Sequence, residues 1–225
     1  MVSGEEDETV RRLARHWRLG ALALALAAWG CGDSAEENLD ASSREGRVEA
    51  VRALGKRRSD AAAEKLASMV NHEDEETAVE AVRALGRMRR PSASRVLRKV
   101  VSENRRPKIR RDAAVELGYQ RETQEAAEVL RRVLRTDPDP RVRGAAATGL
   151  ANLKSLADVP LLVEVAETED DAMVQGRAVG AVERMIGVRF GYDSKASVEE
   201  RRQAVARMRA VAIRAAAVLQ ERERR

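Results

Sequence analysis

An eight-residue apolar pattern, VEAVRALG, occurs at residues 48–55 and again, letter for letter, at residues 79–86. In each copy an alanine precedes a leucine by four residues, which places both side chains on one face of a helix. The repetition indicates that the chain uses one helical packing surface more than once.

Three further segments continue the pattern: IRRDAAVELG at 109–118, VRGAAATGLA at 142–151 and VQGRAVGAVE at 174–183. The last positions of the five segments are 55, 86, 118, 151 and 183, which lie 31, 32, 33 and 32 residues apart. Each segment holds a small residue four positions before a larger apolar one. The pairs are Ala50/Leu54, Ala81/Leu85, Ala113/Leu117, Ala146/Leu150 and Ala178/Val182. We therefore expect five copies of one structural unit.

A second helical run follows four of these segments, after a glycine or a polar break. The runs are 61–70, 92–101, 125–134 and 156–166. Pro91, Pro107 and the pair Asp139-Pro140 stand where helices would begin. Because one helical hairpin cannot bury its apolar stripe alone, the hairpins must stack. The pattern predicts an all-α, right-handed α-solenoid of about five hairpins.

The shared pattern V-R-x-x-A-x-x-x-L-G, with Asp-Pro-Asp-Pro-Arg-Val-Arg at 137–143, resembles the short bacterial HEAT repeat, an armadillo-like helical unit. The ankyrin T-P-L-H signature and the aromatic positions of the tetratricopeptide repeat are missing. We assign residues 46–186 to HEAT-like repeats of the type found in phycobilisome lyases.

The segment 187–225 differs from the repeats and is assigned to a capping loop and a C-terminal helix. Phe190, Tyr192 and Asp193 resemble an F-G-Y-D loop that closes many bacterial HEAT-repeat proteins. Ser197 and Glu200 have the spacing of a capping box, which predicts a helix running to about Gln220. We expect this segment to cover the open end of the solenoid; the alternative is a small binding surface.

The N-terminal region has the pattern of an export signal. Arg11, Arg12, Arg15 and Arg18 precede an apolar run, 19–29, that is too short to span a bilayer, which needs about 20 residues. The sequence Ala28-Trp29-Gly30-Cys31 resembles the lipobox of bacterial lipoproteins, although Trp29 departs from it. The resemblance implies cleavage before Cys31, the one cysteine of the chain, and its modification with lipid.

These features predict a lipoprotein signal peptide over residues 1–30 and a flexible tether over 31–45. We accordingly expect a bacterial cell-envelope protein anchored to a membrane by lipid, on the periplasmic or outer face. Three alternatives stay open: cleavage after Ala27, which would give a soluble secreted or periplasmic form, an uncleaved anchor, and a short buried helix.

Composition and motifs give no indication of catalysis. Aromatic residues make up 2% of the chain, and its two histidines are His16, in the signal, and His72, in a polar inter-hairpin loop. Phosphate-loop, dinucleotide and G-x-S-x-G motifs are missing. HEAT-like relatives include phycobilin lyases and DNA glycosylases, but an exported protein would meet neither substrate. We expect no enzyme activity, no metal and no cofactor, and export disfavours nucleic acid binding.

Positive charge is concentrated in residues 81–111, which hold twelve basic residues and one acid. Arg95, Arg98 and Lys99 have the spacing of one helical face, and the next unit adds three more cations, Arg131, Arg132 and Arg135. HEAT-like proteins line their concave face with second helices, so these six residues are our candidate binding site. A solvated surface is the alternative.

The sequence therefore favours a lipid-anchored HEAT-repeat scaffold that binds a protein partner through a concave, partly basic face. A module that binds anionic lipid or glycan surfaces is the alternative, and a lyase-type enzyme a weaker one. The pattern identifies neither the partner nor the oligomeric state.

Overall fold

The computed structural model describes residue 39 and residues 43–120 and 123–224. The predicted signal peptide, Cys31 and most of the predicted tether lie outside this range. In the described part the chain forms ten α-helices and one 3₁₀ turn, without strands, so the all-α prediction is confirmed. None of the helices described is both long and apolar enough to cross a bilayer.

Five first helices alternate with four second helices, and a long last helix follows. The first helices are α2 (Arg44–Arg57), α4 (Glu75–Met88), α6 (Pro107–Leu117), α8 (Pro140–Leu153) and α10 (Ala172–Ile186). The second helices are α3 (Asp60–Met69), α5 (Pro91–Glu103), α7 (Thr123–Thr136) and α9 (Val159–Thr168), which follows the 3₁₀ turn η2 (Leu156–Asp158). The last helix is α11 (Val198–Arg224).

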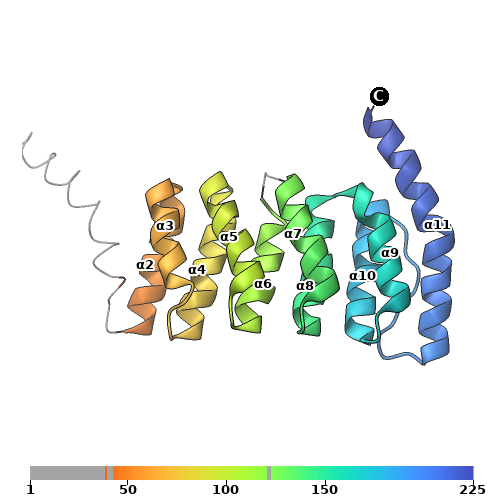
Figure 1. The fold of residues 1–225 in the computed structure, drawn as a ribbon, viewed down its shortest axis with the longest axis horizontal. Helices are drawn as coiled ribbons and strands as arrows, with labels where there is room; N and C mark the ends of the chain where they lie inside the picture. Colours follow the sequence, from red (N-terminus) through yellow and green to blue (C-terminus); the bar gives the residue numbers. More distant parts are fainter. Residues whose placement is uncertain (1–38, 40–42, 121–122, 225) are drawn as a thin grey trace, which may run out of the picture.

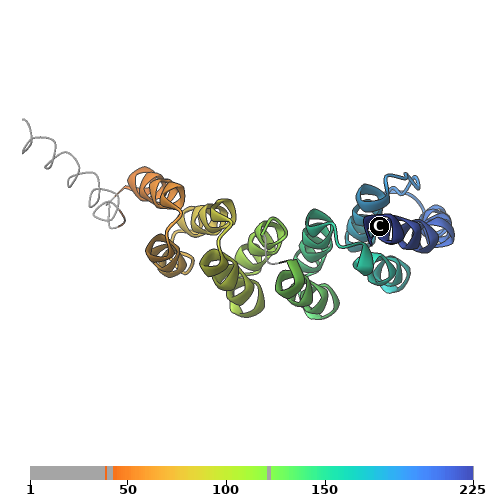
Figure 2. The same ribbon diagram turned by 90° about the horizontal axis from the view of Figure 1, so that it is seen from above.

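The helices form two rows, with the first helices in one and the second helices in the other (Figures 1 and 2). Each first helix packs directly on the first helices of the neighbouring units, and contacts between successive second helices are sparser. In Figure 2 the row of first helices lies on the inner side of a shallow bend. This differs from the expectation that second helices line the concave face.

The helix starts follow from local sequence. Pro91, Pro107 and Pro140 each occupy the first position of a helix, as predicted. Other helices are capped by a serine or aspartate side chain that accepts a backbone N–H; Ser43 does this for α2, so that helix begins inside the predicted tether.

The small and large residues of the repeat are buried, as the pattern predicts. All five pairs, from Ala50/Leu54 to Ala178/Val182, are at most 4% exposed. Gly118 follows directly after the last residue of α6, as the pattern predicts, but two other glycines of the repeat do not end their helices: α2 continues two residues past Gly55 and α4 two residues past Gly86. Both helices end at an arginine in the left-handed conformation, Arg58 and Arg89, each with φ of 49°.

Glycines instead allow the first helices to approach one another closely. A Cβ on Gly149 of α8 would lie 2.6 Å from the Ala114 carbonyl oxygen of α6. A Cβ on Gly118 would lie 2.6 Å from the Gly149 carbonyl oxygen. Because backbone atoms cannot move aside as a flexible side chain can, these positions require glycine.

The same side-chain hydrogen bond recurs in every inter-hairpin turn. At the equivalent position of each turn, a side chain accepts a hydrogen bond of 2.9–3.2 Å from the backbone N–H two residues later. These side chains are His72, Asn104, Asp137 and Glu169. The imidazole of His72 thus has a structural role in its turn.

Arginines join these turns to the units before them. Arg110 of α6 donates two 2.8 Å hydrogen bonds to Asp137, and Arg143 of α8 donates two of 2.9 Å to Glu169. Each guanidinium also donates to a carbonyl in the turn before its own helix. Such bidentate pairs fix the register of neighbouring units as well as contributing energy.

The C-terminal segment covers the last hairpin. Phe190 is 5% exposed, and the Tyr192 hydroxyl lies 2.9 Å from the Ala172 carbonyl oxygen at the start of α10. The loop therefore runs back along α10, and α11 rises beside α9 (Figure 1). Ser197 and Glu200 form the predicted capping box. The helix extends beyond the expected Gln220 to Arg224.

Two glycine substitutions should have opposite effects on stability. Gly149→Ala should lower the free energy of unfolding by about 1–3 kcal/mol, because the new methyl group meets backbone. Gly180→Ala, also inside a first helix, meets no atom within 4 Å and should raise it by about 0.5–1 kcal/mol. Urea unfolding monitored by circular dichroism measures both, and equal effects of the two substitutions would contradict the packing described here.

Candidate functional site

The predicted basic cluster on the second helices makes contacts between repeats. Arg98 of α5 pairs with Glu125 of α7, and Arg131 of α7 pairs with the buried Asp158. Arg135 lies 3.9 Å from Glu164 of α9. Since each of these acids belongs to the following unit, the three arginines bridge successive second helices.

The other three residues of the cluster lie on the same row. The Arg132 guanidinium donates a 2.7 Å hydrogen bond to the Ser102 hydroxyl of the previous unit. Arg95 and Lys99 are exposed on α5. The six predicted residues thus form a series of contacts along the row of second helices, and the structure does not gather them around one cavity.

A different set of side chains follows one position of the repeat along the row of first helices. It is the position directly after the last residue of each repeated segment, and it holds Lys56, Arg87, Tyr119, Asn152 and Arg184. All five lie at or just past the C-terminal ends of their helices. We call these five residues the first-helix track.

A buried carboxylate lies beside the first half of the track. Glu80 of α4 is 5% exposed and lies 2.7 Å from Arg87, 3.3 Å from Arg52 and 3.9 Å from Arg83. Burial acts to raise the pKa of Glu80, but hydrogen bonds from Arg87 and Arg52 outweigh it and hold the pKa below its ordinary value. One carboxylate faces three guanidinium groups here.

A second acid, Glu116 of α6, packs over Gly86 of the neighbouring helix. Burial raises the pKa of Glu116, although the charges of Arg87 and Arg83 act in the opposite direction. Ionisation of Glu116 is thus less favourable in the folded protein than in the unfolded chain.

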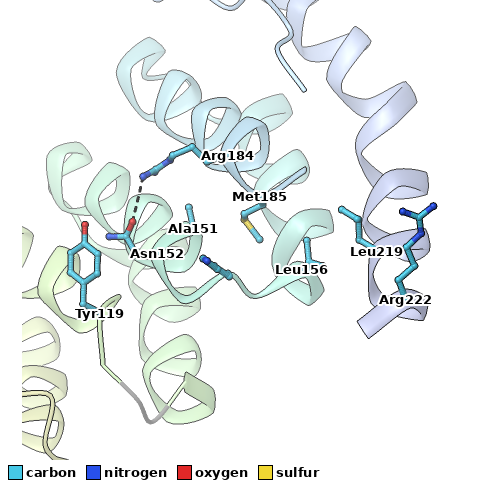
Figure 3. Close-up of a pocket in the computed structure, with 9 residues that line it drawn as sticks. Tyr119, Ala151, Asn152, Leu156, Arg184, Met185, Leu219 and Arg222 are labelled. Carbon is cyan, nitrogen blue, oxygen red and sulfur yellow. Dashed lines mark hydrogen bonds between the residues drawn. The ribbon is translucent and has the colours of Figure 1, made fainter. Parts of the chain in front are cut away.

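The second half of the track opens into a groove of about 700 Å³, which lies between the ends of α6, α8 and α10 and the last turns of α11 (Figure 3). Its apolar surface comes from Ala151, Leu156, Met185 and Leu219. Figure 3 shows Tyr119, Asn152 and Arg184 one after another along one side, with Leu219 and Arg222 facing them from α11.

Lys154, Arg184 and Arg222 give this groove a positive charge, and none of its nine lining residues is acidic. Arg184 makes two long contacts, 3.4 Å each, to the Asn152 side chain and the Gly180 carbonyl oxygen. Both partners are neutral, and among the described residues no acid forms an ion pair with Arg184. Tyr119, 47% exposed, adds an aromatic surface at the edge. The groove is suited to an anionic group that carries an apolar side chain.

Local charge in the sequence did not reveal this groove. Its three cations are 30 or more residues apart, and they meet only because the repeat and α11 bring them together. The sequence did carry one signal for the groove, which is the repeat itself. The residues directly after the third, fourth and fifth repeated segments are Tyr119, Asn152 and Arg184, and all three line the groove.

The two acids beside the track should give opposite pH dependence of stability. Glu80 has a lowered pKa, so its contribution is present above its unfolded pKa and is lost as the pH falls through the folded value. Glu80→Gln should therefore lower the melting temperature at pH 7 by roughly 2–8 °C, from about 1–2 kcal/mol of lost pairing, with little effect at acid pH.

Glu116→Gln is the matched substitution on the next first helix. Because the folded pKa of Glu116 is raised, its ionisation costs stability as the pH rises above the unfolded pKa. The substitution should raise the melting temperature at pH 7 by roughly 1–3 °C and leave it unchanged at acid pH. Melting curves from acid to neutral pH measure both, and parallel profiles for the two variants would contradict this assignment.

Comparisons with known proteins identify the fold and the family. No curated protein matches the chain. Among solved structures, the complex of CpcE and CpcF of phycocyanin lyase from Nostoc sp. PCC7120 matches with a TM-score of 0.52 and 22% identity, over 76% of this chain and 73% of that chain. At that identity the likeness shows a shared fold. The family model for HEAT repeats matches residues 33–116 and 95–183, more than half of the sequence. The chain therefore belongs to the HEAT-repeat family.

Proposed function

We propose that this protein is a lipid-anchored cell-envelope scaffold that binds an acidic segment of a partner protein and catalyses no reaction. The observation that carries the proposal is the groove at the C-terminal end of the first-helix row. It combines an apolar surface with Lys154, Arg184 and Arg222 and has no acid in its lining. An acidic peptide with one apolar side chain is complementary to both features.

Anchoring rests on the N-terminal sequence. The arginine-rich segment, the short apolar run and the lipobox-like Ala28-Trp29-Gly30-Cys31 support export followed by lipid attachment at Cys31. The repeats begin at α2, soon after this segment.

Binding without catalysis is supported by the chemistry of the groove. Its lining residues provide guanidinium, ammonium, amide and phenol groups, and none of these nine residues carries a carboxylate or an imidazole that could act as a base near neutral pH. A solved structure similar to this chain is a complex of two proteins, CpcE and CpcF, which accords with a protein partner.

A binding assay with a short acidic peptide tests the function. The probe is a fluorescein-labelled peptide of about five residues, four glutamates around one leucine. We expect saturable binding that weakens as salt is added and falls about tenfold in the double variant Arg184→Glu, Arg222→Glu, because opposite charges now repel the peptide.

Arg214→Glu is the matched control, since Arg214 is exposed on α11 and does not line the groove. It should bind the peptide as the parent protein does. Vesicles with and without anionic lipid form a second arm. Binding to anionic vesicles with none to the peptide would replace the scaffold with the surface-binding alternative, and an intact mass without lipid on Cys31 would overturn the anchor.

A further inference from the structure

A second hollow lies at the opposite end of the first-helix track. It has a volume of about 570 Å³ and lies between α2 and α4. Four cations line it, Arg52, Lys56, Arg58 and Arg87, together with two acids, Glu49 and Glu80. The four cations outnumber the two acids, so the hollow has an excess of positive charge.

The cations of this hollow remain accessible although some of them are paired. Arg87 is 54% exposed and Arg52 is 57% exposed while both contact Glu80. Lys56 is exposed next to them. A guanidinium has five N–H donors, so contact with one carboxylate leaves donors for another anion.

The two hollows lie on one line. All five first helices run in the same direction and pack side by side, so equivalent repeat positions lie at the same height along the row (Figures 1 and 2). Lys56 and Arg87 line one hollow, and Asn152 and Arg184 line the other. Tyr119 stands between these pairs in the track and presents an exposed ring.

The separation of the hollows sets the length of a ligand that reaches both. Packed helices lie about 8–10 Å apart, and about three such spacings separate the middle of the Lys56/Arg87 pair from the middle of the Asn152/Arg184 pair, which gives roughly 24–30 Å. An extended chain covers about 3.3 Å per residue, so about seven to nine residues span the distance. A helical ligand at about 1.5 Å per residue would need about 16–20.

We propose that the second hollow is a further anion-binding site, and that one extended acidic segment occupies both hollows at once. The inference rests on the proposed function, because the groove at the C-terminal end holds the apolar anchor. The hollow between α2 and α4 binds carboxylates of the same segment about eight residues away. The segment crosses the first helices over Tyr119.

Peptide length is the direct test. The probes are fluorescein-labelled peptides of about 5, 9, 13 and 17 residues, rich in glutamate and serine, with one leucine at either end. Since a second site engaged by the same chain acts as an intramolecular contact, affinity should rise at least about tenfold between about 5 and 13 residues and then level off. A peptide series whose affinity grows evenly with its charge, without a plateau, would overturn the two-site arrangement.

Single substitutions separate the two sites. Lys56→Glu should weaken the long peptide about fivefold and leave the short peptide unchanged, whereas Arg184→Glu should weaken both. Lys195→Glu is the matched control, because Lys195 is an exposed lysine in the capping loop and lines neither hollow. Equal losses from Lys56→Glu and Lys195→Glu would mean that the long peptide responds to general charge and not to the hollow.

The outcomes also distinguish this inference from the proposed function. If the short peptide binds and responds to Arg184→Glu, but length and Lys56→Glu have no effect, the groove stands and the second site is wrong. If the short peptide fails to bind while the long peptide binds through Lys56, the groove is wrong and the hollow between α2 and α4 stands alone. Melting curves of each variant show that it is folded.

Discussion

The close packing of the first helices is the constraint on which the rest of the structure depends. Small residues at their interfaces, such as Gly55, Gly118 and Gly149, let neighbouring backbones approach until no additional methyl group would fit. The second helices are then less tightly packed, because the row of first helices lies inside the bend. The first helices are joined by apolar contacts, whereas the second helices need longer side chains to reach one another.

Arginine provides those connections. Its long apolar stem and planar charged end can reach an acid on the next second helix where two alanines could not touch. Arg98 and Arg131 do this along the row of second helices, and Arg110 and Arg143 do it at the turns. The high arginine content therefore follows from the geometry of the stack, and an arginine-rich stretch in this sequence is weak evidence of a binding surface.

Much of the fold could be predicted from the sequence because the repeat encodes its own contacts. The buried pairs, the proline starts, the capping box at Ser197 and the covering loop at Phe190 each depend on residues close together in the chain. Helix ends were harder to predict. Gly55 and Gly86 suggested ends, but Gly55 packs against α4 and Gly86 packs against α6. The chain turns instead at the strained Arg58 and Arg89, where local sequence gives no such signal.

The candidate site was less predictable, because the charged residues that are neighbours in the sequence differ from those that are neighbours in space. The acidic partners of Arg98 and Arg131 are 27 residues further along the chain, so a local count of charges includes only the arginine of each pair. The groove, in contrast, takes single residues from several units and two more, Leu219 and Arg222, from the helix that closes the stack.

That last helix connects the fold to the function. Every unit of a HEAT-repeat stack exposes a similar surface at the end of its first helix. At the C-terminal end of the stack, α11 adds an apolar side chain, Leu219, and a cation, Arg222, so this end differs from the other units. The chain enters the stack at α2, at the opposite end (Figure 1). An anchor at Cys31 would thus hold the hollow between α2 and α4 near the attachment point and the groove at the far end of the stack. A partner bound along the track would then lie along the whole solenoid, and the number of repeats would set the distance between the two places where the partner is held.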